Sequence, residues 1–231
     1  MLKWIWLLIA IALSCCVQPS KDERQEFKVL EESDEYIKLP EPSYDGNKSL
    51  EKSLMERRSI REYSGEPLTL KELSQLLWAG QGITDPRGFR TAPSAGALYP
   101  LELFVVIGRV EGIEEGVYRY IPEKHALVKV LDGDKREELS AIAVGQKCVK
   151  DAAIDIVITA IYERTTVKYK ERGIRYVHFE VGHSAQNILL QAAALDLGAV
   201  PVGAFDDERL KELLKLSVEQ PLYIIAIGKK T

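Results

Sequence analysis

The sequence predicts an α+β fold, and the pattern of its hydrophobic segments is the reason. Helix-like and strand-like segments alternate irregularly along the 231 residues, whereas a doubly wound sheet needs a regular alternation. Residues 101–107 and 152–162 are apolar runs with the length and composition of buried strands. Residues 176–197 lack a polar face, which predicts a long helix buried in a core or between subunits. A chain of this length suits one domain with a sizeable core.

The first 15 residues predict a signal peptide of the lipoprotein type. Lys3 precedes an apolar run over residues 4–13, which is too short to span a bilayer comfortably and matches the apolar region of a secretory signal. Cys15, at the end of this run, is the candidate for lipidation, with Cys16 as the fallback. An uncleaved anchor and plain secretion are the alternatives. The leader therefore predicts an extracytoplasmic protein, tethered to the cell membrane or secreted.

Residues 16–39 predict a polar tether between this leader and a domain at residues 40–231. The tether is rich in Glu and Asp and has neither helical nor strand periodicity. Cys148 is the only cysteine of the domain, so we expect it to be buried as a small hydrophobic residue. The three histidines are too scattered for a metal site, and the net charge of −4 argues against nucleic acid as a partner.

The other elements follow from periodicity and capping signals. Helices are predicted over residues 50–57 and 69–78, and Thr69 and Glu72 form a capping box at the start of the second. Residues 81–97 hold three glycines and two prolines and predict a long loop, which in a compact domain tends to be functional. The remaining predictions are strands at 116–121, 127–131 and 221–227 and helices at 135–143 and 206–214.

Three arginines and a serine stand together at the end of the first predicted helix. They are Arg57, Arg58, Ser59 and Arg61. Like charges this close repel each other, so a bound anion gives a physical reason for the cluster. Guanidiniums bind phosphate oxygens in bidentate fashion, and a serine hydroxyl can complete the site. A solvated basic helix end, favoured by the helix dipole, is the alternative.

Two further segments offer main-chain donors. The first is a rigid turn made by Pro93, Ser94, Ala95 and Gly96, and the second is the run Pro201, Val202 and Gly203. The glycine of the turn permits close approach of a ligand, and the turn also offers N–H groups and a hydroxyl. The second run has no polar side chains, so it has to act through main-chain hydrogen bonds and apolar cover. A tight loop and a plain strand-to-loop crossing explain them without a ligand.

Read together, these three segments resemble the FMN-dependent nitroreductase family, and more narrowly its SagB-type branch, the azoline-oxidising dehydrogenases of thiazole/oxazole-modified peptides. The resemblance covers residues 40–231. It implies a central, mostly antiparallel sheet flanked by helices, with a long helix in the core or the subunit interface. It also implies a homodimer with FMN at the subunit interface.

The resemblance also assigns roles within the flavin site. The arginine segment serves the phosphate and the pyrimidine edge of FMN, the turn reaches the partner's flavin, and the main chain near Gly203 lies by flavin N5. Lys229 or Lys230 matches a C-terminal phosphate contact of the family, although two lysines at a chain end are usually just solvated. Ala97 stands where general nitroreductases carry asparagine, and the SagB-like branch tolerates small residues there.

Lys168 and Tyr169 resemble the acid/base pair of the azoline-oxidising dehydrogenases. Removal of hydride from carbon must be matched by removal of a nearby proton, and a lysine desolvated beside arginines can serve as that base. A charged loop before a helix is an equally weighted alternative. His183, Gln186 and Asn187 in the long apolar segment are expected to be buried polar groups at the subunit interface.

The sequence thus predicts an FMN-dependent oxidoreductase with ping-pong hydride transfer through flavin N5 and a small-molecule or peptide substrate. Azoline oxidation in a modified peptide, a surface-tethered flavin-binding module without turnover and a purely structural domain are the alternatives. No dinucleotide fingerprint such as GxGxxG occurs, so NAD(P)H would only visit the flavin face. Because NAD(P)H is scarce outside the cytoplasm, a quinone, a redox protein or a substrate dehydrogenation fits better as its redox partner.

Overall fold

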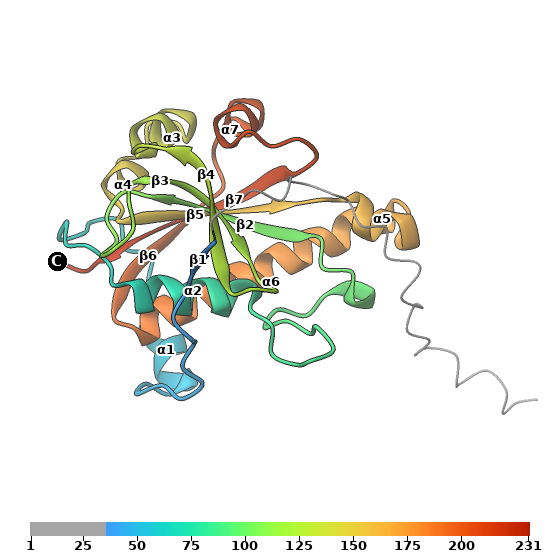
Figure 1. Ribbon diagram of the computed structural model, residues 1–231, viewed down its shortest axis with the longest axis horizontal. Helices are drawn as coiled ribbons and strands as arrows, with labels where there is room; N and C mark the ends of the chain where they lie inside the picture. Colours follow the sequence, from blue (N-terminus) through green and yellow to red (C-terminus); the bar gives the residue numbers. More distant parts are fainter. Residues whose placement is uncertain (1–35) are drawn as a thin grey trace, which may run out of the picture. The chain divides into compact units, whose positions relative to one another are not determined.

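A seven-stranded sheet forms the centre of the computed structural model, which describes residues 36–231 (Figure 1). The strand order is β1-β4-β3-β2-β5-β7-β6, and every neighbouring pair is antiparallel. The strands are β1 (Ile37–Lys38), β2 (Leu101–Ile107), β3 (Gly116–Ile121), β4 (Ala126–Asp132), β5 (Ile154–Ala160), β6 (Leu197–Val202) and β7 (Gln220–Lys229). The predicted α+β class with its mostly antiparallel sheet is confirmed.

Helices cover both faces of this sheet. They are α1 (Leu50–Glu56), α2 (Leu70–Gln81), α3 (Arg136–Ile142), α4 (Lys147–Asp151), α5 (Glu163–Tyr169), α6 (Arg172–Ala194) and α7 (Asp207–Leu214). In Figure 1, α2 and α6 lie along one face, and α3, α4 and α7 lie along the other. Each face has its own apolar core, so that Ile156 of β5 packs into one core and Val157 into the other. This explains why β2 and β5 read as continuous apolar runs.

The folded domain begins earlier than the predicted boundary at residue 40. Ile37–Lys38 form β1 and pair with β4, and the amide of Leu39 donates to the carbonyl of His125 at 3.0 Å. Leu39 is also a buried member of the core. Two paired residues are too few to show strand periodicity, which is why the sequence placed them in the tether. The signal peptide, Cys15 and the rest of the tether lie outside the described residues.

Helix α2 confirms the predicted capping box. The amide of Thr69 donates to the Glu72 carboxylate at 2.8 Å, and the amide of Glu72 donates to the Thr69 hydroxyl oxygen at 3.2 Å. The helix runs to Gln81, farther than predicted, and Gly82 follows it as the C-cap. A β-carbon on Gly82 would meet the ring of Trp78 at 2.1 Å, so only glycine fits this helix end.

Helix α6 differs from the predicted segment in its bounds and in its exposed face. It begins at Arg172, ahead of the predicted start at residue 176, and only one side of the helix is buried. Phe179, His183 and Gln186 are exposed, so the expectation that His183 and Gln186 are buried does not hold within a single chain. Asn187 is half-buried and donates to the carbonyl of Thr91 at 3.2 Å. Within residues 36–231, no helix is long and apolar enough to cross a membrane.

Candidate functional site

The arginine segment, residues 57–61, lies along the edge strand β6. Arg57 is the C-cap of α1, so the segment leaves the helix at once. Ser59 forms an isolated parallel bridge with Ala199, and the amide of Ile60 donates to the carbonyl of Ala199 at 3.0 Å. These contacts hold an otherwise irregular segment beside β6 with its charged side chains outward.

The guanidiniums of this segment have no carboxylate partner. Among the described residues, Arg57, Arg58 and Arg61 form no ion pair within 4.0 Å, and Arg58 donates only to the carbonyls of Met55 and Arg57. By contrast, the buried Arg119 and Arg136 are paired with carboxylates. Three arginines within five residues, without a carboxylate partner in the described part of the chain, suit a multiply charged anion such as a phosphate.

The two C-terminal lysines, Lys229 at the end of β7 and Lys230 directly after it, contact different parts of the chain. Lys229 forms an ion pair with the capping-box carboxylate of Glu72 at 2.5 Å, so it is committed to holding α2. Lys230 pairs with the exposed Asp196 at 2.6 Å and lines a small cavity together with Arg57 and Arg58. Of the two lysines predicted to contact phosphate, only Lys230 lies with the arginines.

That cavity has a volume of about 10 Å³ in a single chain. This is room for roughly one water molecule, not for a ring system. Leu189 and Ala193, near the C-terminal end of α6, form part of its wall. One chain therefore offers charges to a ligand without enclosing it.

The turn at residues 93–96 is held by hydrogen bonds within the chain. The amide of Ala95 donates to the Glu180 carboxylate at 2.9 Å, and the amide of Tyr99 donates to the Ser94 hydroxyl oxygen at 2.9 Å. The Ala95 N–H, which the sequence offered as a ligand donor, is thus occupied. Gly96 has a φ of +65°, a backbone conformation that favours glycine.

The turn touches the predicted acid/base pair. A β-carbon on Gly96 would lie 2.9 Å from the hydroxyl oxygen of Tyr169 and 3.1 Å from Nζ of Lys168. Both residues end the short helix α5, so they do not lie in the charged loop that was the alternative. Lys168 is exposed, and the desolvation expected for a base is therefore not provided by one chain. Two segments singled out separately from the sequence meet at one corner.

Gly203 directly follows Val202, the last residue of β6. Val202 points into the core, and Gly203 is exposed. Gly203 lies four positions after Ala199, whose carbonyl accepts the hydrogen bond from Ile60 of the arginine segment. Four positions correspond to about 13 Å along a strand. The main chain of β6 thus connects the arginine segment to the predicted N5 contact.

The turn lies toward the opposite end of α6 from the arginine cavity. It is bound at Glu180, whereas the cavity is walled by Ala193. Thirteen residues of helix correspond to about 20 Å. Within one chain, therefore, the turn and the arginine segment face separate regions.

Glu180 is a residue of this corner that the sequence analysis missed. Its side chain lies on the buried side of α6, and burial raises its pKa, against the opposing effects of the Ala95 amide and the Ser94 side chain. A glutamate between the apolar residues Val177 and Val181 was the available signal. A second missed group is Arg164, which donates to the carbonyl of Tyr99 at 3.0 Å and to the Glu102 carboxylate at 2.6 Å.

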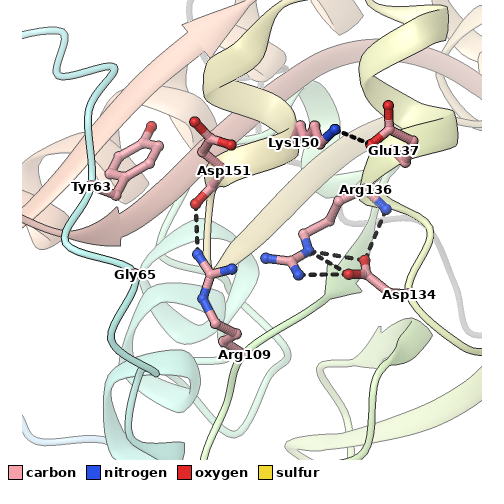
Figure 2. Close-up of a pocket in the computed structure, with 8 residues that line it drawn as sticks. All are labelled: Tyr63, Gly65, Arg109, Asp134, Arg136, Glu137, Lys150 and Asp151. Atoms are coloured by element: carbon pink, nitrogen blue, oxygen red, sulfur yellow. Dashed lines mark hydrogen bonds and ion pairs between the residues drawn. The ribbon is translucent and has the colours of Figure 1, made fainter.

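A larger cavity, of about 370 Å³, lies elsewhere and involves none of the predicted site residues (Figure 2). Its charged groups already have partners in the chain. Arg136 binds Asp134, Lys150 binds Glu137, and Arg109 donates to the carbonyl of Asp151 at 2.6 Å. Because these interactions tie α3 and the end of α4 to the sheet, we interpret this cavity as structural.

Comparisons with known proteins agree with the sequence and the fold. The sequence model of the nitroreductase family matches residues 54–229. A protein of Methanocaldococcus jannaschii assigned to the nitroreductases is 53% identical over 181 residues, which are 78% of this chain and 91% of that protein. A Ralstonia eutropha structure with the same assignment has 32% identity and a TM-score of 0.75, covering 87% of this chain and 92% of that one.

A peptide-modifying protein is also similar. The microcin B17-processing protein McbC of Escherichia coli is 29% identical over 136 residues, which are 56% of this chain. The matched region is 50% of that protein, so this chain corresponds to about half of it.

Proposed function

Because the chain belongs to the nitroreductase family, a family of flavin oxidoreductases, we propose that it is an FMN-dependent oxidoreductase with ping-pong hydride transfer. One observation carries the proposal. The guanidiniums of the arginine segment lie along β6, the strand that leads to Gly203, and have no ion-pair partner within residues 36–231. A dianionic phosphate next to a flat polar ring fits this combination of cations and main-chain groups.

The residues of the site would divide the work of binding. Arg57, Arg58 and Lys230, which line the small cavity, bind the phosphate, and the hydroxyl of the next residue in the chain, Ser59, adds a neutral donor. When bound, FMN supplies a ring that accepts hydride at N5 and passes it to a second substrate. Arg61 at the pyrimidine edge favours the reduced ring because reduction places negative charge there. Gly203 offers main chain without a side chain in the way.

A homodimer with FMN between the subunits explains the division of the site within one chain. The arginine segment and the 93–96 turn lie at different ends of α6, and the single-chain cavity is too small for a flavin. If the turn serves the partner's flavin, both observations follow. The exposed residues of α6, such as Phe179 and Gln186, would then be covered by the second subunit.

Lys168 and Tyr169 are the proposed acid/base pair. Nζ of Lys168 takes the proton that the substrate loses together with the hydride, and the hydroxyl of Tyr169 orients the reacting group. The partner subunit and bound substrate would supply the desolvation that one chain lacks. The substrate itself is a small molecule or a peptide.

Azoline oxidation in a modified peptide is the second candidate function. The contact of Gly96 with Lys168 and Tyr169 favours it, because dehydrogenation at carbon needs a base beside the flavin. The similarity to the microcin B17-processing protein supports it as well. A flavin-binding module without turnover is the non-enzymatic alternative.

For localisation, we propose that residues 1–15 are a lipoprotein signal and that Cys15 carries the lipid. The apolar run and its cysteine support this proposal. Radiolabelled palmitate incorporated by the full chain, and lost in Cys15→Ala, is the expected result. Label retained in Cys15→Ala and lost in Cys16→Ala would move the site to Cys16, and no label in either would contradict lipidation.

The absorbance spectrum of the purified full chain tests the cofactor and its turnover. We expect an oxidised flavin band that bleaches with dithionite under anaerobic conditions and returns when a small quinone is added. A protein that holds flavin but is neither reduced by donors nor reoxidised by acceptors would be the binding module. A protein that stays colourless after incubation with FMN would contradict the proposal.

A further inference from the structure

Glu180 is the only acidic residue of α6, and its side chain is buried. It is 4% exposed, and no cation lies within ion-pair distance of it in residues 36–231. A carboxyl group buried without a cation is unfavourable unless hydrogen bonds compensate it. Its compensation comes mainly from the turn, through the Ala95 amide at 2.9 Å, with further contributions from the Ser94 side chain and the charge of Arg90.

The next residue of the turn carries this contact to the acid/base pair. Ala95 is bonded to Glu180, and Gly96, one peptide bond later, touches Lys168 and Tyr169. The turn thus adds a second connection between α6 and the end of α5, beside the direct edge-to-face contact of Tyr169 with Tyr176. Without the Glu180 carboxyl the Ala95 amide loses its acceptor, and Gly96, whose backbone can adopt many conformations, is free to move away from Lys168 and Tyr169.

From this geometry we propose that Glu180 is a positioning residue, which fixes the 93–96 turn and thereby sets the orientation of Lys168 and Tyr169 toward the substrate. The inference rests on the proposed function, since it assigns a task within the same site. Glu180 does not touch the reacting atoms. It acts through the amide of Ala95, so a side chain that keeps an acceptor oxygen at that place retains most of the effect.

Three variants separate positioning from folding. Glu180→Gln keeps the acceptor, Glu180→Ala removes it, and Ala95→Pro removes the donor from the other side. Proline suits Ala95 because it opens the short 3-10 turn Ala95–Ala97 after an extended Ser94. Asp155→Asn is the matched control, because Asp155 is also a buried acid but points into the core on the α3 and α4 side, away from the turn.

The first readout is hydrogen exchange of the 94–97 backbone in the full chain. We expect the Ala95 amide to be protected in the wild type and in Glu180→Gln, and to exchange faster in Glu180→Ala. Unchanged protection in Glu180→Ala would overturn the inference. This readout is independent of flavin, so a colourless wild type would contradict the proposed function and leave the test of Glu180 intact.

The second readout is steady-state kinetics with a reduced nicotinamide as the electron donor and a small quinone as the acceptor, which takes up a proton together with the hydride. We expect Glu180→Ala and Ala95→Pro to lower kcat, counted per bound FMN, on the order of tenfold to a hundredfold, as displaced catalytic groups do. The kcat of Glu180→Gln should stay within about threefold of the wild-type value. The kcat of the double variant Glu180→Ala with Ala95→Pro should be no lower than that of either single variant. Equal kcat in all variants, or a loss of the same size in Asp155→Asn, would overturn the inference. If Glu180→Ala does not fold, Ala95→Pro and Glu180→Gln decide the question.

Discussion

Gly96 lies against Tyr169 so closely that a β-carbon on the glycine would come within 2.9 Å of the phenolic oxygen. Gly96 also has a positive φ, so substitution there combines backbone strain with a clash. Gly88 shares the positive φ, at +87°, but a β-carbon there would meet nothing within 4 Å. The two glycines therefore separate strain from contact.

We expect Gly96→Ala to lower activity and Gly88→Ala to leave it intact. Both should lose about 1–2 kcal/mol in the free energy of unfolding, the usual penalty for a β-carbon in a left-handed conformation. Only Gly96→Ala displaces Tyr169 and Lys168, so only it should reduce kcat, on the order of tenfold or more. Urea unfolding and quinone reduction measure the two effects. Equal activity in both variants would show that this contact has no role in turnover.

Removal of a guanidinium from the arginine segment should weaken FMN binding. For Arg57→Ala and Arg61→Ala we expect Kd to rise about tenfold to a hundredfold, because a charge-assisted hydrogen bond is worth about 1.5–3 kcal/mol. Arg209→Ala is the control, since Arg209 is an exposed arginine of α7 without an ion pair among the described residues. Fluorescence titration with FMN measures Kd. Equal Kd values in all three variants would exclude the segment as the phosphate site.

We expect substitution of Lys229 to affect mainly stability and substitution of Lys230 to affect mainly FMN binding. Lys229→Ala removes the partner of the Glu72 capping carboxylate, so we expect a loss of about 1 kcal/mol in unfolding free energy with FMN affinity largely kept. Lys230→Ala removes a cation beside Arg57, so we expect weaker FMN binding with little loss of stability. Thermal unfolding and the same titration distinguish the two. The reverse pattern would mean that Lys229, not Lys230, contacts the phosphate.

Asp155 should make stability depend on pH. Burial without a hydrogen-bond partner raises its pKa well above the usual range, and Arg136 only partly opposes this. The unfolded chain releases this proton near about pH 4, whereas the folded chain keeps it. The folded state therefore holds more protons above that pH, and stability falls as pH rises until the folded pKa is reached.

Asp155→Val should remove this part of the pH dependence and raise the unfolding free energy at pH 7 by about 1–3 kcal/mol, because no buried carboxyl is left without a partner. Asp155→Asn should remove the pH dependence alone. Urea unfolding from about pH 4 to about pH 9 measures both effects. A stability of Asp155→Val that follows the wild type at every pH would contradict this account.

The sequence pattern alone predicted those elements whose burial or capping depends on neighbouring residues of the chain. Strand β2 has the predicted bounds because both of its faces are buried, and the Thr69 capping box needs only four consecutive residues. The short helices α4 and α5 were not predicted, since α4 has only five residues and the α5 sequence ERTTVKY is mostly polar and includes the β-branched run Thr165-Thr166-Val167.

Contacts between distant residues decided the rest of the site. The sequence singled out the arginine segment and the turn as parts of one site, but it could not indicate that Ala95 donates to Glu180, 85 positions away. The same holds for Lys229, whose partner Glu72 is 157 positions away. Which donors remain free for a ligand is therefore a property of the folded chain.

The central claim is that the arginine segment of one chain and the turn of a second chain serve one flavin. Mixing two inactive variants tests it most directly, one with Arg57→Ala and Arg61→Ala and the other with Gly96→Trp. After co-refolding, random pairing should restore about one quarter of the wild-type sites, because each mixed dimer holds one site that is intact in both parts. Activity no higher than the sum of the separate variants, with mixed dimers present, would contradict the account.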